Sequence, residues 1–171
     1  GNPNVGKSTL FNALTGLRQH TGNWPGKTVE VARGRCLRQG QAYTLVDLPG
    51  TYSLLAHSAE EEVARDFLCF GGACGAVVVC DAAGLERSLG LVLRTLVCVN
   101  LLDEAARKGI RVDLPALSRH LGVPVAGVSA SREEGLDDLM ETLDSLLSAA
   151  APPEPRPVRY PPAVEFAAAA L

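Results

Sequence analysis

Two spacings of apolar residues alternate along this chain, one typical of helices and the other of buried strands. Residues 8–17, STLFNALTGL, have helical spacing and a glycine that ends the helix, whereas residues 28–37 and 42–48 favour strands. The turn at residues 39–41 predicts that these two strands form an antiparallel hairpin. A serine followed by acidic residues marks the start of a second helix at residue 58.

The second half of the chain repeats an order of strand and helix. Continuous apolar runs at residues 75–82 and 96–100 predict buried strands, and residues 123–130 predict another. Helical patterns cover residues 85–95, 115–122 and 135–150. Strands that alternate with helices predict an α/β fold. We expect a mostly parallel sheet with one antiparallel hairpin strand and helices on both faces.

Three segments depart from this order. Residues 18–27 are rich in turn formers and lack periodicity, which predicts a mobile loop. Residues 151–162 are a proline-rich linker, and residues 163–171 resemble the first turns of a helix. We therefore expect one domain over residues 1–150, followed by the linker and the beginning of a helical domain.

Composition narrows the classes of function. The 171 residues are 47% hydrophobic and 20% charged, which is typical of a folded globular domain. A net charge of −3 and scattered arginines argue against nucleic acid or an anionic membrane as a partner. The five cysteines lack metal-ligand spacing, so we expect buried thiols in a reducing cytosol. No apolar run is long enough to span a membrane, which predicts a soluble chain without membrane insertion.

The first eight residues, GNPNVGKS, satisfy the phosphate-binding pattern GxxxxGK[ST]. Glycines let successive backbone N–H groups point at phosphates, Lys7 adds a point charge for the outer phosphates, and the Ser8 hydroxyl ligates magnesium. A helix follows at once and adds its positive N-terminal end. This helix argues against the alternative, a glycine-rich turn with a surface lysine. The motif predicts the three-layer sandwich of P-loop NTPases.

Two connections in such a fold look incomplete. A phosphate-binding loop normally follows a buried strand, yet no strand precedes Gly1. The helix at residues 85–95 runs into the next strand without the few residues that a reversal needs. We expect that the first strand and some residues near Thr95 and Leu96 are missing. The alternative at the second place is a short helix that ends near Leu91.

DLPG, at residues 47–50, lies where the strand of residues 42–48 ends. A carboxylate at Asp47 can hold magnesium through water, and the backbone N–H of Gly50 can bind a γ-phosphate. The pattern is also an everyday turn. Its place at a strand end, 40 residues after Lys7, favours the catalytic interpretation.

NLLD, at residues 100–103, follows a buried strand and predicts a base-reading carboxylate at Asp103. Guanine presents donors at N1 and at the N2 amine, whereas adenine has an acceptor at N1 and would leave the carboxylate unpaired. A helix cap at Asp103 is the alternative. The segment SAS at residues 129–131 can complete the pocket with backbone N–H groups. Together the four motifs favour a guanine nucleotide.

Longer stretches of the chain carry a resemblance to a known family. GNPNVGKSTLFNALTG, GNWPGKTVE, DLPGTYSL, ARDFL, CDAAGLERSL and the NxxDEA…KGI segment are similar to the GTPase domain of the bacterial ferrous iron transport protein B family. The resemblance covers nearly the whole chain. It also implies a strand before the phosphate loop and more residues before the NxxD strand, in agreement with both gaps.

The resemblance implies a role for two further residues. Thr28 would close on magnesium and the γ-phosphate, and its alternative is the first residue of a β-branched strand. Asn4 resembles an asparagine that binds potassium in this family. A neutral amide oxygen beside phosphate oxygens suits a large monovalent cation. A turn residue whose side chain holds the loop remains the alternative for Asn4.

The expected catalytic residues are Lys7, Thr28 and Gly50. The expected magnesium ligands are Ser8, Thr28 and Asp47, and the potassium ligand is Asn4. The expected phosphate-binding residues lie on three loops: Gly1, Asn2, Pro3, Asn4, Val5, Gly6, Lys7, Ser8, Thr9, Gly26, Lys27, Thr28, Val29, Glu30, Asp47, Leu48, Pro49 and Gly50. The expected guanine-binding residues are Asn100, Leu101, Leu102, Asp103, Ser129, Ala130 and Ser131.

Thr51 and Tyr52 stand where many GTPases carry a glutamine that orients water, so we expect slow hydrolysis. Trp24 is interpreted either as part of the loop or as a packed anchor. The resemblance implies a switch that regulates iron(II) uptake at the cytoplasmic face of the bacterial inner membrane. Its expected partners are GTP or GDP, the helical and transmembrane domains of its own full-length protein, and small cytosolic regulators. The alternatives are a ribosome- or tRNA-associated GTPase and a non-hydrolysing interaction module.

Overall fold

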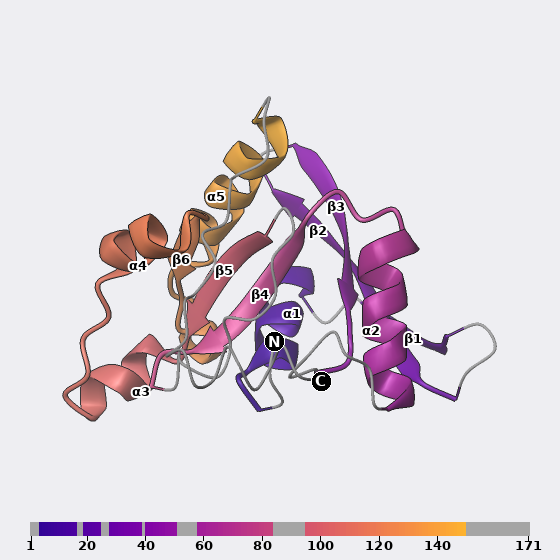
Figure 1. Cartoon of the computed structure of the whole chain (residues 1–171), viewed down its shortest axis with the longest axis horizontal. Helices are drawn as coiled ribbons and strands as arrows, with labels where there is room; N and C mark the ends of the chain where they lie inside the picture. The colour runs from indigo at the N-terminus through magenta and orange to yellow at the C-terminus, as the bar shows by residue number, and fades with distance from the viewer. Residues whose placement is uncertain are drawn as a thin grey trace, which may run out of the picture.

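The computed structural model describes residues 4–16, 19–24, 28–38, 40–50, 58–83 and 95–149. Their strands form two three-stranded sheets, an antiparallel sheet A in the order β1-β2-β3 and a parallel sheet B in the order β4-β5-β6 (Figure 1). The bounds in sheet A are β1 (Gln19–Asn23), β2 (Glu30–Arg38) and β3 (Gln41–Asp47). Those in sheet B are β4 (Ala76–Asp81), β5 (Thr95–Asn100) and β6 (Val125–Gly127). The expected parallel strands and antiparallel hairpin are both present, on separate sheets.

The helices begin and end at residues suited to those places. They are α1 (Lys7–Thr15), α2 (Ala59–Phe70), α3 (Leu102–Arg107), α4 (Leu114–Leu121) and α5 (Leu136–Ser148), with a short 3-10 turn η2 (Ala130–Arg132). Ser58 accepts a hydrogen bond from the backbone N–H of Glu61 at 3.2 Å, as an N-cap should. Gly16 and Gly122 end α1 and α4 in the left-handed conformation. The expected start of a helix at residue 58 is confirmed.

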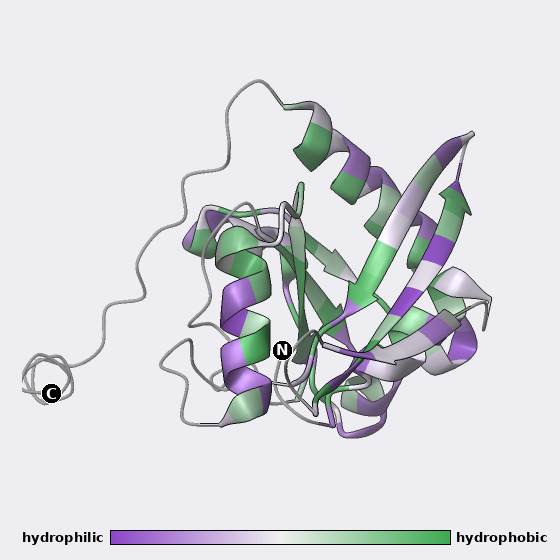
Figure 2. Cartoon of the chain, turned by 90° about the vertical axis from the view of Figure 1, so that its right-hand side faces the viewer, coloured by the Kyte–Doolittle hydropathy of each residue, from purple (hydrophilic) through white to green (hydrophobic). Residues whose placement is uncertain are grey.

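Strand β5 forms the centre of the core because its side chains are buried on both faces. Leu96 and Cys98 belong to the cluster that includes α1 and α5, whereas Val97 and Val99 belong to the cluster that includes α4. Burying one such side chain stabilises the fold by about 1.5–3 kcal/mol. Helices therefore cover both faces of sheet B (Figure 1). Each of α2 and α5 has a hydrophobic and a hydrophilic side (Figure 2).

The structure corrects the expected loop at residues 18–27. Strand β1 lies there and pairs with β2, with Gln19 opposite Gly34 and Asn23 opposite Glu30. Periodicity gave no sign of it because β1, QHTGN, contains no large apolar side chain. Trp24 is a packed anchor, since its ring meets that of Phe67 edge-on with centroids 5.7 Å apart.

Three of the four cysteines whose burial is described are buried, and Cys74 is exposed, so the expectation of a buried thiol was wrong for Cys74. Burial, together with the neighbouring Cys80, raises the pKa of the Cys98 thiol from 9.0 to about 12. A neutral, buried thiol is chemically inert.

Some expectations concern residues that the structure does not describe. These are the phosphate-loop residues 1–3, residues 25–27, Thr51 and Tyr52, most of the helix at 85–95, the linker 151–162 and the segment 163–171. Within the described ranges no helix is long and apolar enough to cross a membrane.

Candidate nucleotide-binding site

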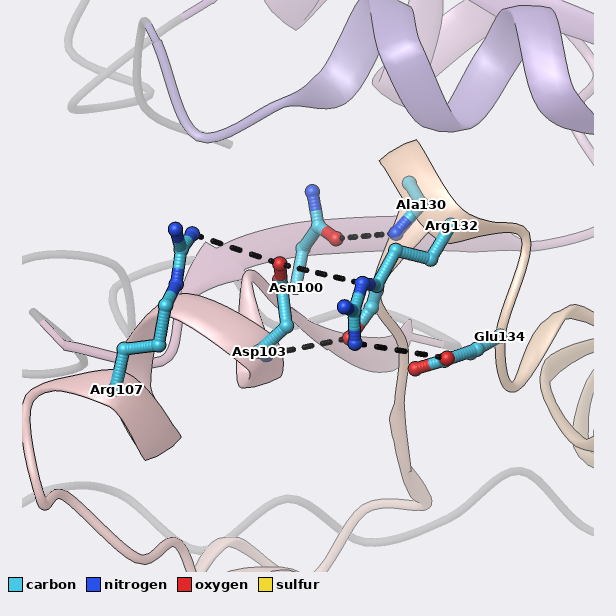
Figure 3. A network of polar contacts seen from close by, with 7 residues as sticks. Asn100, Asp103, Arg107, Ala130, Arg132 and Glu134 are labelled. Carbon is cyan, nitrogen blue, oxygen red and sulfur yellow. Dashed lines mark hydrogen bonds and ion pairs between the residues drawn. The ribbon is translucent and has the colours of Figure 1, made fainter.

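Asn100, the last residue of β5, joins three of the expected motifs. Its side chain is 1% exposed, and its Nδ2 donates to the carbonyl of Val5 at 3.0 Å. Its Oδ1 accepts from the backbone N–H of Ala130 at 3.1 Å (Figure 3). The two ends of one amide thus connect the phosphate-binding loop to the segment of residues 129–131. The motifs that lie far apart in the sequence meet at the carboxyl end of β5.

Gly6 allows this contact for two reasons. Its φ of +78° lies in the left-handed region, which L side chains rarely adopt. A Cβ at this position would also lie 2.3 Å from Nδ2 of Asn100. Helix α1 begins immediately afterwards, with the N–H of Leu10 donating to the Gly6 carbonyl at 3.0 Å. The loop can therefore approach β5 only with a glycine here.

Lys7 and Asp47 are in contact at the expected phosphate end of the site. Lys7 Nζ donates to Asp47 Oδ1 and to the Leu48 carbonyl, each at 2.5 Å. The Ser8 hydroxyl donates to the other carboxylate oxygen of Asp47 at 3.2 Å. Lys7 and Asp47 are 24% and 12% exposed, so the pair is partly buried. The first two expected motifs are thus in direct contact.

Ser8 and Asp47 fit the oxygen-rich chemistry of magnesium. A hydroxyl and a carboxylate that already lie within hydrogen-bond distance can share one hard cation, since magnesium takes few protein ligands and keeps several waters. Among the described residues no group of three or more His, Cys, Asp or Glu side chains could hold a metal.

The other expected phosphate-binding residues differ in what they can offer. Val5 and Val29 are buried in the core at 5% and 6% exposure, so only their backbone groups can meet a ligand. Thr28 is exposed, and none of the hydrogen bonds among the described residues joins it to Lys7 or Ser8. The remaining described residues of this set are exposed or half-buried: Asn4, Thr9, Glu30, Leu48, Pro49 and Gly50.

Asp103 lies at the end of the site where the sequence predicts the base. Its backbone N–H donates to the Ser129 hydroxyl at 3.2 Å, and its side chain is 14% exposed. Oδ1 is buried and has no hydrogen-bond partner in the described part of the chain. An unpaired buried acceptor is unfavourable by about 1–3 kcal/mol, which a ligand that brings a donor can relieve. The alternative role as a helix cap is wrong, because Leu101 is the N-cap of α3 and Asp103 lies in the first turn.

Leu101 and the segment after β6 shape the same end. Leu101 has a φ of +64°, a strained conformation for a non-glycine residue and one that often marks functional sites. Ser129 and Glu134 exchange two backbone hydrogen bonds, of 3.1 and 3.3 Å, which close a short loop around η2. Ala130 is buried inside this loop and Ser131 is exposed.

Three charged residues near Asp103 escaped the sequence analysis. Arg107 Nη2 lies 3.6 Å and Arg132 Nε 4.0 Å from Oδ2 of Asp103, and Arg132 also pairs with Glu134 at 3.8 Å (Figure 3). The spacing of four residues between Asp103 and Arg107 is a sequence signal that could have indicated the first pair. Nothing in the sequence indicates the second, because it depends on how the loop after β6 folds back.

A model of the family described as ferrous iron transport protein B matches residues 1–143. The chain belongs to the ferrous iron transport protein B family. The Fe(2+) transporters FeoB of Salmonella typhimurium and of Escherichia coli K12 are each 43% identical to it over 155 residues, or 84% of the chain. The chain spans 20% of the length of these two relatives.

Solved structures from the same family share the fold. The cytosolic domain of the T. maritima FeoB iron transporter in a GDP form superposes with a TM-score of 0.87 and 39% identity, covering 97% of this chain and 68% of that one. The G domain of the same transporter gives a TM-score of 0.79 with 41% identity, covering 85% and 94%. The FeoB G domain of Methanococcus jannaschii gives 0.76 with 36% identity, covering 87% and 94%. The expected α/β P-loop fold is confirmed.

Proposed function

We propose that this chain is the GTP-binding and GTP-hydrolysing switch domain of a ferrous iron transporter. The observation that carries the proposal is the pair of amide hydrogen bonds of Asn100, which hold the phosphate-binding loop and the loop at residues 129–131 together. The T. maritima and S. thermophilus relatives were solved with GDP, and the former also with GMPPNP. These findings support a site for a guanine nucleotide.

At the base end, Asp103 supplies the selectivity. Two carboxylate oxygens can accept from N1–H and from the N2 amine of guanine, and Oδ1 is left without another partner. Adenine presents an acceptor at N1 and would leave a buried charge unpaired. The Ser129 hydroxyl, bonded to the Asp103 backbone, fixes the start of α3 for this purpose.

At the phosphate end, Lys7 exchanges partners. In the structure its ammonium group binds Asp47 and the Leu48 carbonyl, and an incoming β- or γ-phosphate offers stronger charge-assisted bonds. Release of Asp47 leaves its carboxylate beside the Ser8 hydroxyl, where both would hold magnesium. The bound magnesium would neutralise the charge that develops on the phosphates. Thr28 and the backbone N–H of Gly50 would close on the γ-phosphate from neighbouring loops.

Asn4 is proposed as a ligand for potassium. It is exposed, and its φ of +63° places it in a tight turn of the phosphate-binding loop. Its neutral amide oxygen suits a monovalent cation, which would supply positive charge as an arginine finger does in other GTPases. With no such arginine among the expected motif residues, hydrolysis by the chain alone should be slow.

The link to iron transport rests on family membership alone. The relatives are iron(II) transporters of which this chain spans one-fifth, so we propose that hydrolysis here regulates a transport step performed by other domains. The partners would then be the helical and transmembrane domains of the same protein and small cytosolic regulators. The chain would act at the cytoplasmic face of the bacterial inner membrane.

Phosphate release under multiple turnover tests the activity. We expect hydrolysis of GTP with magnesium to exceed that of Lys7→Ala by at least about tenfold, because the lysine contributes a charge-assisted bond in the transition state. We also expect faster hydrolysis in potassium than in sodium, and an Asn4→Ala variant that no longer distinguishes the two salts. Equal rates for the unmodified chain and Lys7→Ala would reduce the domain to a binding module, and RNA-stimulated turnover would favour a ribosome-associated enzyme.

A further inference from the structure

Two arginines from different elements converge on the base-reading carboxylate. Arg107 extends from the end of α3 and Arg132 from η2, and both guanidinium groups face Oδ2 of Asp103 (Figure 3). The arginines are themselves 73% and 61% exposed, whereas Asp103 is only 14% exposed. An anion at this depth loses most of its water, and these are the cations that lie within ion-pair distance of it in the described structure.

The separations show how the arginines act. At 3.6 and 4.0 Å they exceed hydrogen-bond distance, so the guanidinium groups attract the carboxylate without occupying its lone pairs. A carboxylate has about four acceptor sites, and those directed at a ligand stay available. Attraction from two sides also opposes rotation of the carboxylate about its Cβ–Cγ bond. The charge is thus stabilised and the group oriented before any ligand arrives.

Arg132 is itself held in place. Its Nη1 pairs with Oε1 of Glu134 at 3.8 Å, and Glu134 is joined to Ser129 by two backbone hydrogen bonds. The Ser129 hydroxyl accepts a hydrogen bond from the backbone N–H of Asp103. The polar contacts therefore form a closed cycle that runs from Asp103 through Arg132, Glu134 and Ser129 back to Asp103. The loop after β6 therefore carries its arginine to a defined place over the first turn of α3.

We propose that Arg107 and Arg132 are positioning residues that set the selectivity of Asp103 for the two-donor edge of guanine. This inference rests on the proposed function. A carboxylate that is held with both oxygens toward the purine accepts from N1–H and from the N2 amine together. A carboxylate that rotates freely still meets one donor. The arginines therefore favour guanine over hypoxanthine, which keeps N1–H and lacks the amine.

Calorimetric titration with GDP, IDP and ADP tests the inference on the whole chain, in the unmodified form and in Arg107→Ala, Arg132→Ala and the double variant. We expect each single variant to weaken GDP binding about two- to fivefold, as a partly exposed ion pair would. We expect IDP binding to weaken less, so that the ratio of GDP to IDP affinity narrows. Lysine in place of Arg107 or Arg132 should restore much of the ratio of GDP to IDP affinity, because lysine keeps the positive charge. High salt should narrow the ratio in the unmodified chain as well.

Arg119→Ala provides the matched control, because it removes the same charge from α4, and Arg119 is not an ion-pair partner of Asp103 in the described structure. Its ratio of GDP to IDP affinity should stay unchanged. If the arginine variants lose GDP and IDP affinity in equal proportion, the arginines merely support the loop and the inference is overturned. Tighter GDP binding in these variants would overturn it too, since the arginines would then compete with the base. If the unmodified chain fails to prefer GDP over ADP, the proposed function itself fails.

Discussion

The two ends of the candidate site are built in different ways. At the base end, Asn100 is 1% exposed and both ends of its amide bind backbone groups. At the phosphate end, Lys7 is 24% exposed and holds Asp47 through an ion pair that phosphate can replace. Buried amide hydrogen bonds fix a geometry, whereas a partly exposed ion pair can exchange partners more readily. We therefore expect the base end to be preformed and the phosphate end to be the part that a ligand rearranges.

The largest expected effect on stability comes from a substitution at the base end. Asn100→Ala leaves the Val5 carbonyl and the Ala130 N–H buried without partners, so we expect the free energy of unfolding to fall by about 2–4 kcal/mol. Urea denaturation followed by circular dichroism measures this loss. Asn23→Ala, at an exposed position in β1, is the matched control and should change the stability by less than about 0.5 kcal/mol.

The same measurement on Lys7→Ala sharpens the contrast. Because the Lys7–Asp47 pair is only partly buried, its loss should lower the free energy of unfolding by about 1 kcal/mol, less than Asn100→Ala does, whereas we expect nucleotide binding to be strongly impaired. A loss for Lys7→Ala as large as that for Asn100→Ala would show that the two ends are equally structural, and the contrast between them would be wrong.

Asp103→Ala is expected to act on binding and to leave the fold intact. Loss of a buried acceptor for two guanine donors should weaken GTP and GDP alike by about 10- to 100-fold, equivalent to about 1.5–3 kcal/mol. Competition of both nucleotides against a fluorescent GDP analogue measures the two affinities, and the melting temperature without ligand reports the fold. Unchanged preference for guanine over adenine in this variant would refute the assignment of Asp103 to the base.

Cys98, two residues before Asn100 on β5, gives an effect that appears only at alkaline pH. Burial raises the pKa of its thiol from 9.0 to about 12, so the folded state keeps a proton that the unfolded chain releases. The stability that this proton contributes is complete below pH 9 and is lost progressively as the pH rises toward 12. Cys98→Val should flatten the loss of stability measured between pH 9 and pH 11. Identical slopes for the two proteins would contradict the account of the thiol.

The sequence predicted what depends on local chemistry. The phosphate-binding loop, the helix start at Ser58 and the alternation of strands and helices all follow from residue types at short spacing, and the structure contains them. Strand β1 could not be predicted, because its stability comes from pairing with β2 and its own residues are polar or glycine.

Some contacts in and near the site could not be predicted from the sequence for the same reason. The ring contact of Trp24 with Phe67 joins residues 43 positions apart, and Arg132 reaches Asp103 only because the loop after β6 folds back. Such contacts are set by tertiary structure, which no local pattern records. The sequence predicted Asp103 as the base-reading residue, but it could not indicate the two arginines that lie near its carboxylate.

The central claim is that Lys7 and Asp103 serve opposite ends of one guanine-nucleotide site. Calorimetric titration of the whole chain with GDP and with ADP, in magnesium and potassium, tests it most directly. The account predicts one GDP site per chain and an affinity for ADP at least about 100-fold weaker, because adenine leaves the Asp103 carboxylate unpaired. Equal affinities for GDP and ADP, or the absence of binding to either, would contradict it.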